Sequence, residues 1–268
     1  MTKFPTALGV ALVVFGCAHR TSKPLESIEG NAIDISVRSH RAPLPIFYHD
    51  SAYYLLGEMG RPYEICIINR SNDRIEAVVA VDGRDTISGR TADYRNDRGY
   101  VIDPEEETCI DGFRSSMDAV AAFEFTHRKD AYASRMGSGQ NVGVIGVAIF
   151  EEDAARRKVI ATPKRRYRDE APRPSSGSAM EAEAAAADDA HSLGTGYGAH
   201  TESPAESVVF IRKRASDPEE LIALYYDGRE GLEKRGIRVP DEISFRPDAP
   251  DPFPGADGNR FAPPPPER

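Results

Sequence analysis

The side chains that could perform catalysis do not follow a recognised catalytic spacing in this sequence. No Gly-x-Ser-x-Gly motif occurs, and Gly137-Ser138-Gly139 has the composition of a turn. None of the six histidines has another at H-x-H or H-x-x-x-H spacing, so a zinc site would need ligands from distant positions. The sequence therefore favours a protein that is not an enzyme and that uses no metal or other cofactor.

Two short motifs suggest ion or phosphate binding, but turns and close packing explain them better. Asp82-Gly83-Arg84-Asp85 carries two carboxylates and lacks the loop of ligands that calcium requires. Residues 194–198 (GTGYG) lack the preceding strand and following helix of a phosphate-binding loop. We expect a hairpin at the first motif and, at the second, a backbone that passes close to a β-domain.

The charge of the chain argues against nonspecific binding to nucleic acid. The formal net charge is −9, whereas nucleic-acid binding depends on a basic surface. The one basic cluster, residues 164–168 (KRRYR), is followed by an acidic segment that would neutralise it. We therefore expect no nucleic-acid partner.

The N-terminus resembles the signal of a bacterial lipoprotein. Residues 7–15 are almost entirely apolar, which is too short for a membrane-spanning helix of about 20 residues and suits a secretory signal. Residues 14–17 (VFGC) resemble a lipobox, although Phe15 replaces the usual small or aliphatic residue. We expect cleavage before Cys17 and a lipid anchor on it, with a plain secretory signal as the alternative. Ala18 favours the outer membrane, with the protein facing the periplasm.

Two further cysteines remain in the exported chain, Cys66 and Cys109. Both lie in apolar stretches typical of strands, and disulfides form in oxidising compartments. A Cys66–Cys109 disulfide is therefore possible, and two separate buried thiols are the alternative.

Residues 46–160 have the pattern of a mainly β, sandwich-like domain. Residues 75–82 alternate with the period of two expected of a strand, and Asp82-Gly83 supplies a hairpin turn. Residues 142–150 (VGVIGVAIF) are apolar on both faces and predict a central strand. No long amphipathic helix separates the strands, which disfavours a βαβ arrangement.

Composition also sets the limits of the other segments. Residues 1–16 form the signal peptide, residues 17–45 a polar tether with an edge strand at 32–37, and residues 161–206 a disordered linker or long loop. We expect a short helix at 180–190 within that linker, and a proline-rich disordered tail over residues 247–268.

Residues 207–246 predict a small C-terminal element that packs on the β-domain. It should contain strands at 208–211 and 221–226, then a short helix from about residue 228 to 235 that ends at Gly236. The stretch 221–226 (LIALYY) is apolar on every side, which favours a buried strand over a helix.

Several short strings resemble a group of uncharacterised β-rich bacterial exported proteins. These strings include residues 81–83 (VDG), 110–114 (IDGFR), 120–123 (VAAF) and 141–148 (NVGVIGVA). The resemblance covers a little over half of the chain. It implies a shared fold and no particular activity.

A lipid anchor, a β-domain and the lack of a catalytic motif predict a non-enzymatic binding or assembly module of the cell envelope. Its partners would be the membrane, through the lipid, and an envelope protein or glycan. Because loops on a rigid β-scaffold often carry recognition, we expect contact around Tyr48, Tyr53, Tyr54 and Arg114.

The alternative is an envelope hydrolase or metal-dependent enzyme whose site is assembled from loops. This alternative requires the fold to bring at least two of a small set of titratable side chains within hydrogen-bond reach in one cleft: His40, His49, His127, Asp85 and Asp111.

Overall fold

Strands dominate this protein because apolar side chains recur at every second position along much of the chain. The computed structural model describes residues 24–160 and 192–240. The predicted signal, Cys17, the helix expected at 180–190 and the tail from 247 lie outside the described residues. Residues 24–160 and 192–238 belong to one compact unit, which holds all the strands and helices that the structure describes.

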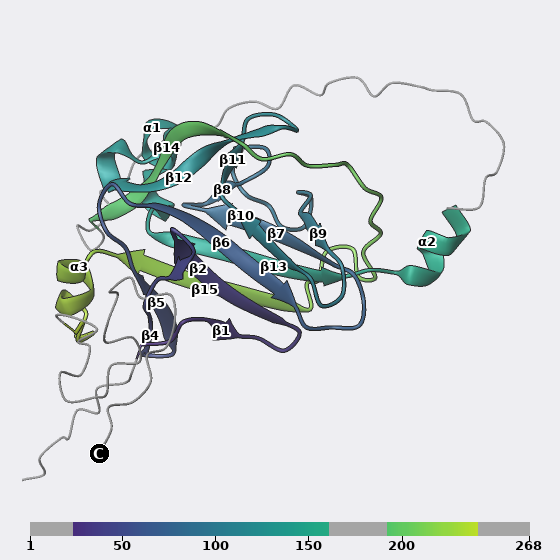
Figure 1. Ribbon diagram of the computed structural model, residues 1–268, viewed down its shortest axis with the longest axis horizontal. Coiled ribbons are helices and arrows are strands. Elements are labelled where there is room, and N and C mark those ends of the chain that lie inside the picture. The colour runs from purple at the N-terminus through teal and green to yellow at the C-terminus, as the bar shows by residue number, and fades with distance from the viewer. Residues whose placement is uncertain (1–23, 161–191, 241–268) are drawn as a thin grey trace, which may run out of the picture. The chain divides into compact units, whose positions relative to one another are not determined.

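The first sheet has eight strands and is antiparallel throughout (Figure 1). β6 pairs with β2 along one edge, and its other edge is divided between β12, near Tyr63, and β10, near Cys66. The strands are β1 (Ile28–Glu29), β2 (Ile33–Ser39), β3 (Ala42–Pro43), β6 (Pro62–Asn69), β10 (Glu107–Ile110), β11 (Gly112–Arg114), β12 (Ala119–His127) and β14 (Leu193–Glu202).

The second sheet has seven strands in the order β4-β5-β15-β13-β7-β8, and β9 also pairs with β7. β15 runs parallel to β5 and antiparallel to β13, so a strand from the end of the chain lies in the middle of this sheet. The strands are β4 (Ile46–His49), β5 (Ala52–Leu56), β7 (Ile75–Val81), β8 (Arg84–Asp85), β9 (Tyr100–Ile102), β13 (Val144–Glu151) and β15 (Glu220–Asp227).

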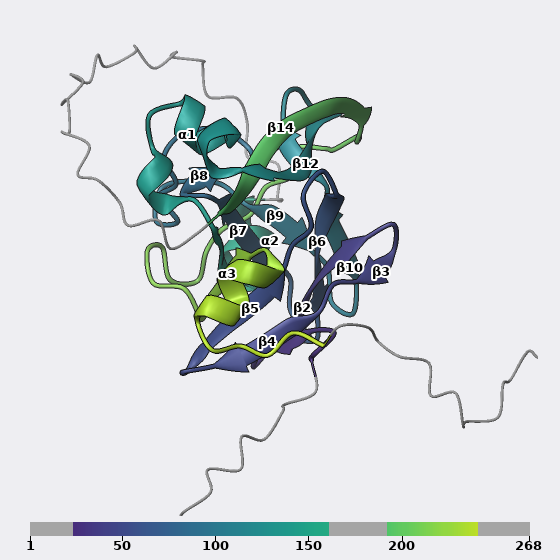
Figure 2. The ribbon, with the colours of Figure 1, turned by 90° about the vertical axis from the view of Figure 1, so that its left-hand side faces the viewer.

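One hydrophobic core lies between the two sheets, which makes the fold a β-sandwich. It combines side chains of the first sheet, such as Ile35, Ile67 and Phe123, with side chains of the second, such as Val147 and Leu224. Figure 2 shows α1 beside β14 and α3 beside β5. The helices are short: η1 (Arg128–Asp130), α1 (Tyr132–Arg135), η2 (Gly139–Asn141), α2 (Ala154–Ile160) and α3 (Arg229–Lys234).

The structure confirms the mainly β, sandwich-like fold and several of its predicted parts. Asp82 and Gly83 take positive φ angles of 55° and 73° in the hairpin between β7 and β8. β13 is the predicted central strand, with β15 on one side and β7 on the other. The stretch at 221–226 is a strand, and the helix after it ends before Gly236, whose φ is 83°.

The structure differs from the predicted segments at three places. Residues 207–246, predicted as a small element that packs on the β-domain, supply β15, which lies inside the second sheet. Residues 28–43, assigned to the tether, form β1, β2 and β3. The strand predicted at 32–37 is present as β2, but it pairs with both β1 and β6 instead of lying at an edge, and it buries Ile33, Ile35 and Val37. Its outward side chains are polar, which made the segment resemble a tether. Residues 193–202, assigned to the linker, form β14, because the ladder with β12 stabilises a glycine-rich stretch of low strand propensity.

The predicted strand at 208–211 is wrong. Val208 and Val209 are 51% and 61% exposed, and the nearest pairing is an isolated bridge between Glu152 and Arg212. Arg212 holds the segment instead. Its guanidinium pairs with the buried Glu76 at 2.6 Å, donates to several backbone carbonyls and lies 3.8 Å from the centre of the Phe150 ring.

Candidate functional site

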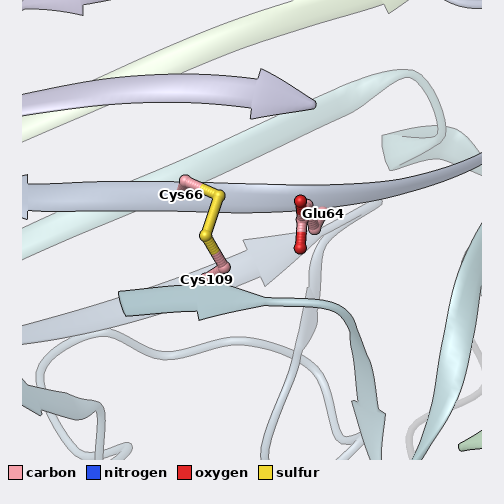
Figure 3. Close-up of side chains that lie close together, drawn as sticks. All are labelled: Glu64, Cys66 and Cys109. Atoms are coloured by element: carbon pink, nitrogen blue, oxygen red, sulfur yellow. A yellow bond between two sulfur atoms is a disulfide. The ribbon is translucent and has the colours of Figure 1, made fainter. Parts of the chain in front are cut away.

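A disulfide joins Cys66 and Cys109, which stand directly opposite each other on β6 and β10 (Figure 3). Their Cα atoms are 4.0 Å apart. The two side chains lie on the outer face of the first sheet, because the neighbouring Ile65 and Ile67 point into the core. Burial is unequal across the bond: Cys66 is 0% exposed, whereas Cys109 is an exposed residue.

Glu64 lies beside this bond, on the same strand and face as Cys66 (Figure 3). One carboxylate oxygen and the two sulfur atoms lie within 4.8 Å of one another, the one grouping at metal-binding separation among residues 24–160 and 192–240. Sulfur atoms bonded to each other offer no thiolate to a metal. In its oxidised state the group is therefore a disulfide next to a carboxylate.

An ion pair crosses the outer face over the disulfide. Arg38, on β2, stands opposite Glu64 of β6. Glu107, on β10, comes two residues before Cys109. The Arg38 guanidinium donates to both carboxylate oxygens of Glu107, at 2.5 and 3.1 Å. In the register of the three strands Cys66 lies between the two ends of this diagonal, which is consistent with its burial on an outward face.

The structure separates the residues of the predicted contact surface. Tyr48 is 53% exposed and its ring centre lies 5.0 Å from that of Tyr53, which packs against the core. Tyr54 faces outward, towards Tyr225. Arg114 belongs to β11 of the first sheet, and its backbone N–H donates to the carbonyl of Thr86, next to β8 at the opposite edge of the second sheet. The Arg114 guanidinium bonds the carbonyl and hydroxyl of Ser203, so its hydrogen-bonding groups serve the fold.

A patch of apolar side chains lies on the outer face of the second sheet. We call Tyr54, Gly146, Leu221, Ala223 and Tyr225 the outer patch; they face away from core residues such as Leu55 and Leu224. Leu221 is 61% exposed and Tyr225 is 37% exposed. The sequence pattern missed this surface, because apolar residues on both faces of 221–226 indicated burial on both sides.

The middle of the outer patch is formed by small residues. Gly146 stands opposite Ala223, and a Cβ placed on Gly146 would meet no atom within 4 Å. The rings of Tyr54 and Tyr225 lie 5.7 Å apart at one end, and Leu221 lies at the other, opposite Ala148. The face is open above the small residues and has apolar side chains at each end.

Asp82 is the most perturbed carboxylate of the described chain, and it lies in the core. Its oxygens accept from the Tyr226 hydroxyl at 2.6 Å and from the backbone N–H groups of Gly143 and Thr195 at 2.9 and 2.8 Å. Burial raises the pKa of Asp82 to about 6, and these hydrogen bonds limit the rise. The Thr195 hydroxyl links Tyr226 to Tyr63, at 2.7 and 2.6 Å. The network connects both sheets.

Two of the side chains named for the enzyme alternative line one pocket, without the hydrogen bond that the alternative requires. His40 and Asp111 line a pocket of about 300 Å³, together with Arg38, Glu64 and Thr201. Asp111 accepts a hydrogen bond from Ser203, at 3.2 Å. His40 and Asp111 share the pocket without a hydrogen bond between them in the described structure, so it supplies neighbouring groups rather than an assembled acid–base pair.

The other three side chains of that set lie elsewhere. His49 pairs with Asp50 at 3.3 Å in the turn between β4 and β5. His127 ends β12, and Asp85 is buried beside β7, where it accepts the Ser88 N–H at 2.6 Å.

No known protein-family model, curated protein or solved structure matches this chain. The resemblance to uncharacterised exported proteins therefore has no matched family behind it. Within the described ranges, no helix is long and apolar enough to cross a membrane.

Proposed function

We propose that this protein is a non-enzymatic binding module of the bacterial cell envelope, held at the membrane by a lipid on Cys17. Its outer patch would contact an envelope protein. The Cys66–Cys109 disulfide supports an exported location, because such bonds persist in oxidising compartments. The lipobox-like residues 14–17 support the anchor.

The outer patch is the observation that carries the proposal. A strand with one solvated face normally presents polar side chains there, whereas β15 presents Leu221, Ala223 and Tyr225. Contiguous exposed apolar surface on a rigid scaffold marks interaction sites. The aliphatic part of the outer patch favours a protein partner over a glycan partner. Sugar rings stack on aromatic faces, and the two tyrosines occupy only one end of the patch.

Photocrosslinking in intact cells tests this proposal. A photoreactive residue at Leu221 should capture one reproducible envelope protein, and the same residue at Glu124 should not. Glu124 is the matched control, because it is exposed in mid-strand on the other sheet. Leu221→Lys should abolish binding to the purified partner, and Glu124→Lys should leave it unchanged. Equal binding by both variants, or capture of glycan alone, would contradict the proposal.

The second candidate is an envelope hydrolase, for which the pocket shared by His40 and Asp111 would supply neighbouring titratable groups. Turnover of an envelope substrate that is abolished by His40→Ala and retained by Leu221→Lys would establish that candidate instead. The two variants therefore separate an enzyme from a binding module.

A further inference from the structure

We infer that the Cys66–Cys109 bond is a site of thiol–disulfide exchange, at which an incoming thiolate attacks Sγ of Cys109 and releases the sulfur of Cys66. The inference is independent of the outer patch and of the proposed function. It rests on the unequal access to the two sulfur atoms and on the charges around them.

Access favours Cys109. A thiolate attacks a disulfide in line with the S–S bond, from the side away from the leaving sulfur, and the rate depends on which sulfur can be reached. A thiolate that attacks the sulfur of Cys109 in line would approach across the outer edge of β10. This edge is unpaired in the described part of the chain, where β10 pairs only with β6. Cys109 is also exposed.

Attack at Cys66 is obstructed. The in-line approach to its sulfur comes from β2, where Ser36 stands directly opposite and is itself buried. Cys66 has 0% exposure, and the Arg38–Glu107 ion pair crosses the face above it. The geometry thus directs exchange to one of the two sulfurs.

The chemistry balances with a monothiol as reductant. The thiolate sulfur bonds to Sγ of Cys109, the Sγ–Sγ bond breaks, and its electron pair leaves on Cys66, which then takes a proton from solvent. The products are a mixed disulfide on Cys109 and a buried thiol on Cys66. A second thiol would complete reduction by attacking the mixed disulfide.

Glu64 should slow this exchange through the negative charge of its carboxylate, without taking part in the bond changes. Its carboxylate lies within 4.8 Å of both sulfurs, so it repels the incoming thiolate and disfavours negative charge on the leaving Cys66. Removing that charge should accelerate the reaction, and a neutral substitution elsewhere on the same face should not.

Glutathione provides the test, applied to the folded full chain in a Cys17→Ala background so that only the strand cysteines are counted. After acid quenching, alkylation and peptide mass mapping, glutathione should be found on Cys109 at least about tenfold more often than on Cys66. Glu64→Gln should raise the rate several-fold, whereas Glu124→Gln should not change it. The accelerated rate should be independent of low urea concentrations.

Two single-cysteine variants in the same Cys17→Ala background provide a separate measurement. The free Cys109 thiol of Cys66→Ala should react with a thiol reagent at least about tenfold faster than the free Cys66 thiol of Cys109→Ala, and the difference should vanish in denaturant. Glutathione on Cys66, equal labelling of both sulfurs, or exchange that follows global unfolding would overturn the inference.

Discussion

Asp82 shows how a single buried carboxylate links the stability of this protein to pH. The Tyr226 hydroxyl donates to Asp82, so its oxygen must accept from Thr195, whose oxygen in turn accepts from Tyr63. Each proton in this chain points towards the carboxylate, which suits an ionised Asp82. Burial nevertheless raises its pKa to about 6, from an ordinary value of 3.8.

The sign of the pH effect follows from that direction. Between pH 3.8 and about 6 the folded state holds the Asp82 proton more tightly than the unfolded state does. The contribution of Asp82 to stability is therefore fully present below its unfolded pKa and is lost as the pH rises through about 6.

Tyr226→Phe should reveal this linkage. The change removes the donor that stabilises the ionised carboxylate, so it should cost about 1–3 kcal/mol of unfolding free energy, with a larger cost at neutral than at acid pH. Urea unfolding at both pH values measures the difference. Tyr63→Phe is the matched control, because its hydroxyl bonds Thr195 rather than Asp82, and its cost should be the same at both pH values. Equal costs for Tyr226→Phe at the two pH values would contradict the linkage.

At the scale of the element, β14 shows why a glycine-rich segment can be a strand. A Cβ on Gly194 would lie 2.6 Å from Cβ of Ala131 and 2.6 Å from Cγ1 of Val142. The absence of a side chain at Gly194 therefore lets β14 approach η1, α1 and the segment before β13 while it pairs with β12. This contact places Thr195 beside Asp82.

Gly194→Ala should destabilise the fold by about 1–3 kcal/mol, because the new methyl group overpacks a closed contact. Gly146→Ala is the comparison, since a Cβ there meets nothing within 4 Å, and it should be neutral or slightly stabilising. Thermal unfolding of both variants distinguishes them. Similar losses of stability at the two positions would contradict the idea that close packing around Gly194 sets the cost.

For the whole molecule, the order of strands in space departs from the order along the chain. β15 lies between β5 and β13, and β14 adds to the edge of β12, although residues 161–191 separate both from the earlier strands in sequence. The segment from Leu193 to Asp227 is therefore part of the sandwich rather than an attachment to it.

Cleavage at an engineered protease site within residues 161–191 should leave the two fragments associated. The fragments share the β12–β14 and β13–β15 ladders and one core, so they should elute together in gel filtration and unfold in one transition. The uncleaved chain with the same insertion is the control. Separation of the fragments without denaturant would contradict this strand order.

The proposed lipid anchor concerns the whole molecule, because it would hold the protein at the membrane. Cys17→Ala should prevent lipidation and release the protein from membranes to a soluble fraction, with the fold unchanged. Membrane fractionation and the mass of the mature N-terminus measure this. The control substitution Ala18→Ser keeps the cysteine, and the protein that carries it should remain membrane-bound. An unchanged distribution of the Cys17→Ala protein would rule out the lipid anchor.

The sequence by itself determined the local features of this protein. The strand over 75–81, the Asp82-Gly83 turn and the apolar run that became β13 each follow from local steric and burial preferences, and each is present. The alternation in the sequence of 75–81 does not carry over to burial, because Glu76 and Val78 on the other face of the strand are buried as well. The same patterns predicted a mainly β sandwich. They also predicted β15 and the end of α3 at Gly236.

Only the tertiary structure decided which faces are covered and which distant residues meet. Alternation says that a strand has two faces, but it cannot say that Leu221 lies outward on β15 or that β2 is internal. Asp82 meets Thr195, which is 113 positions away in sequence, and Cys66 meets Cys109, which is 43 positions away. Local preferences do not specify such contacts. Long-range ladders and burial set those contacts, because they stabilise segments such as β14 against their own propensity.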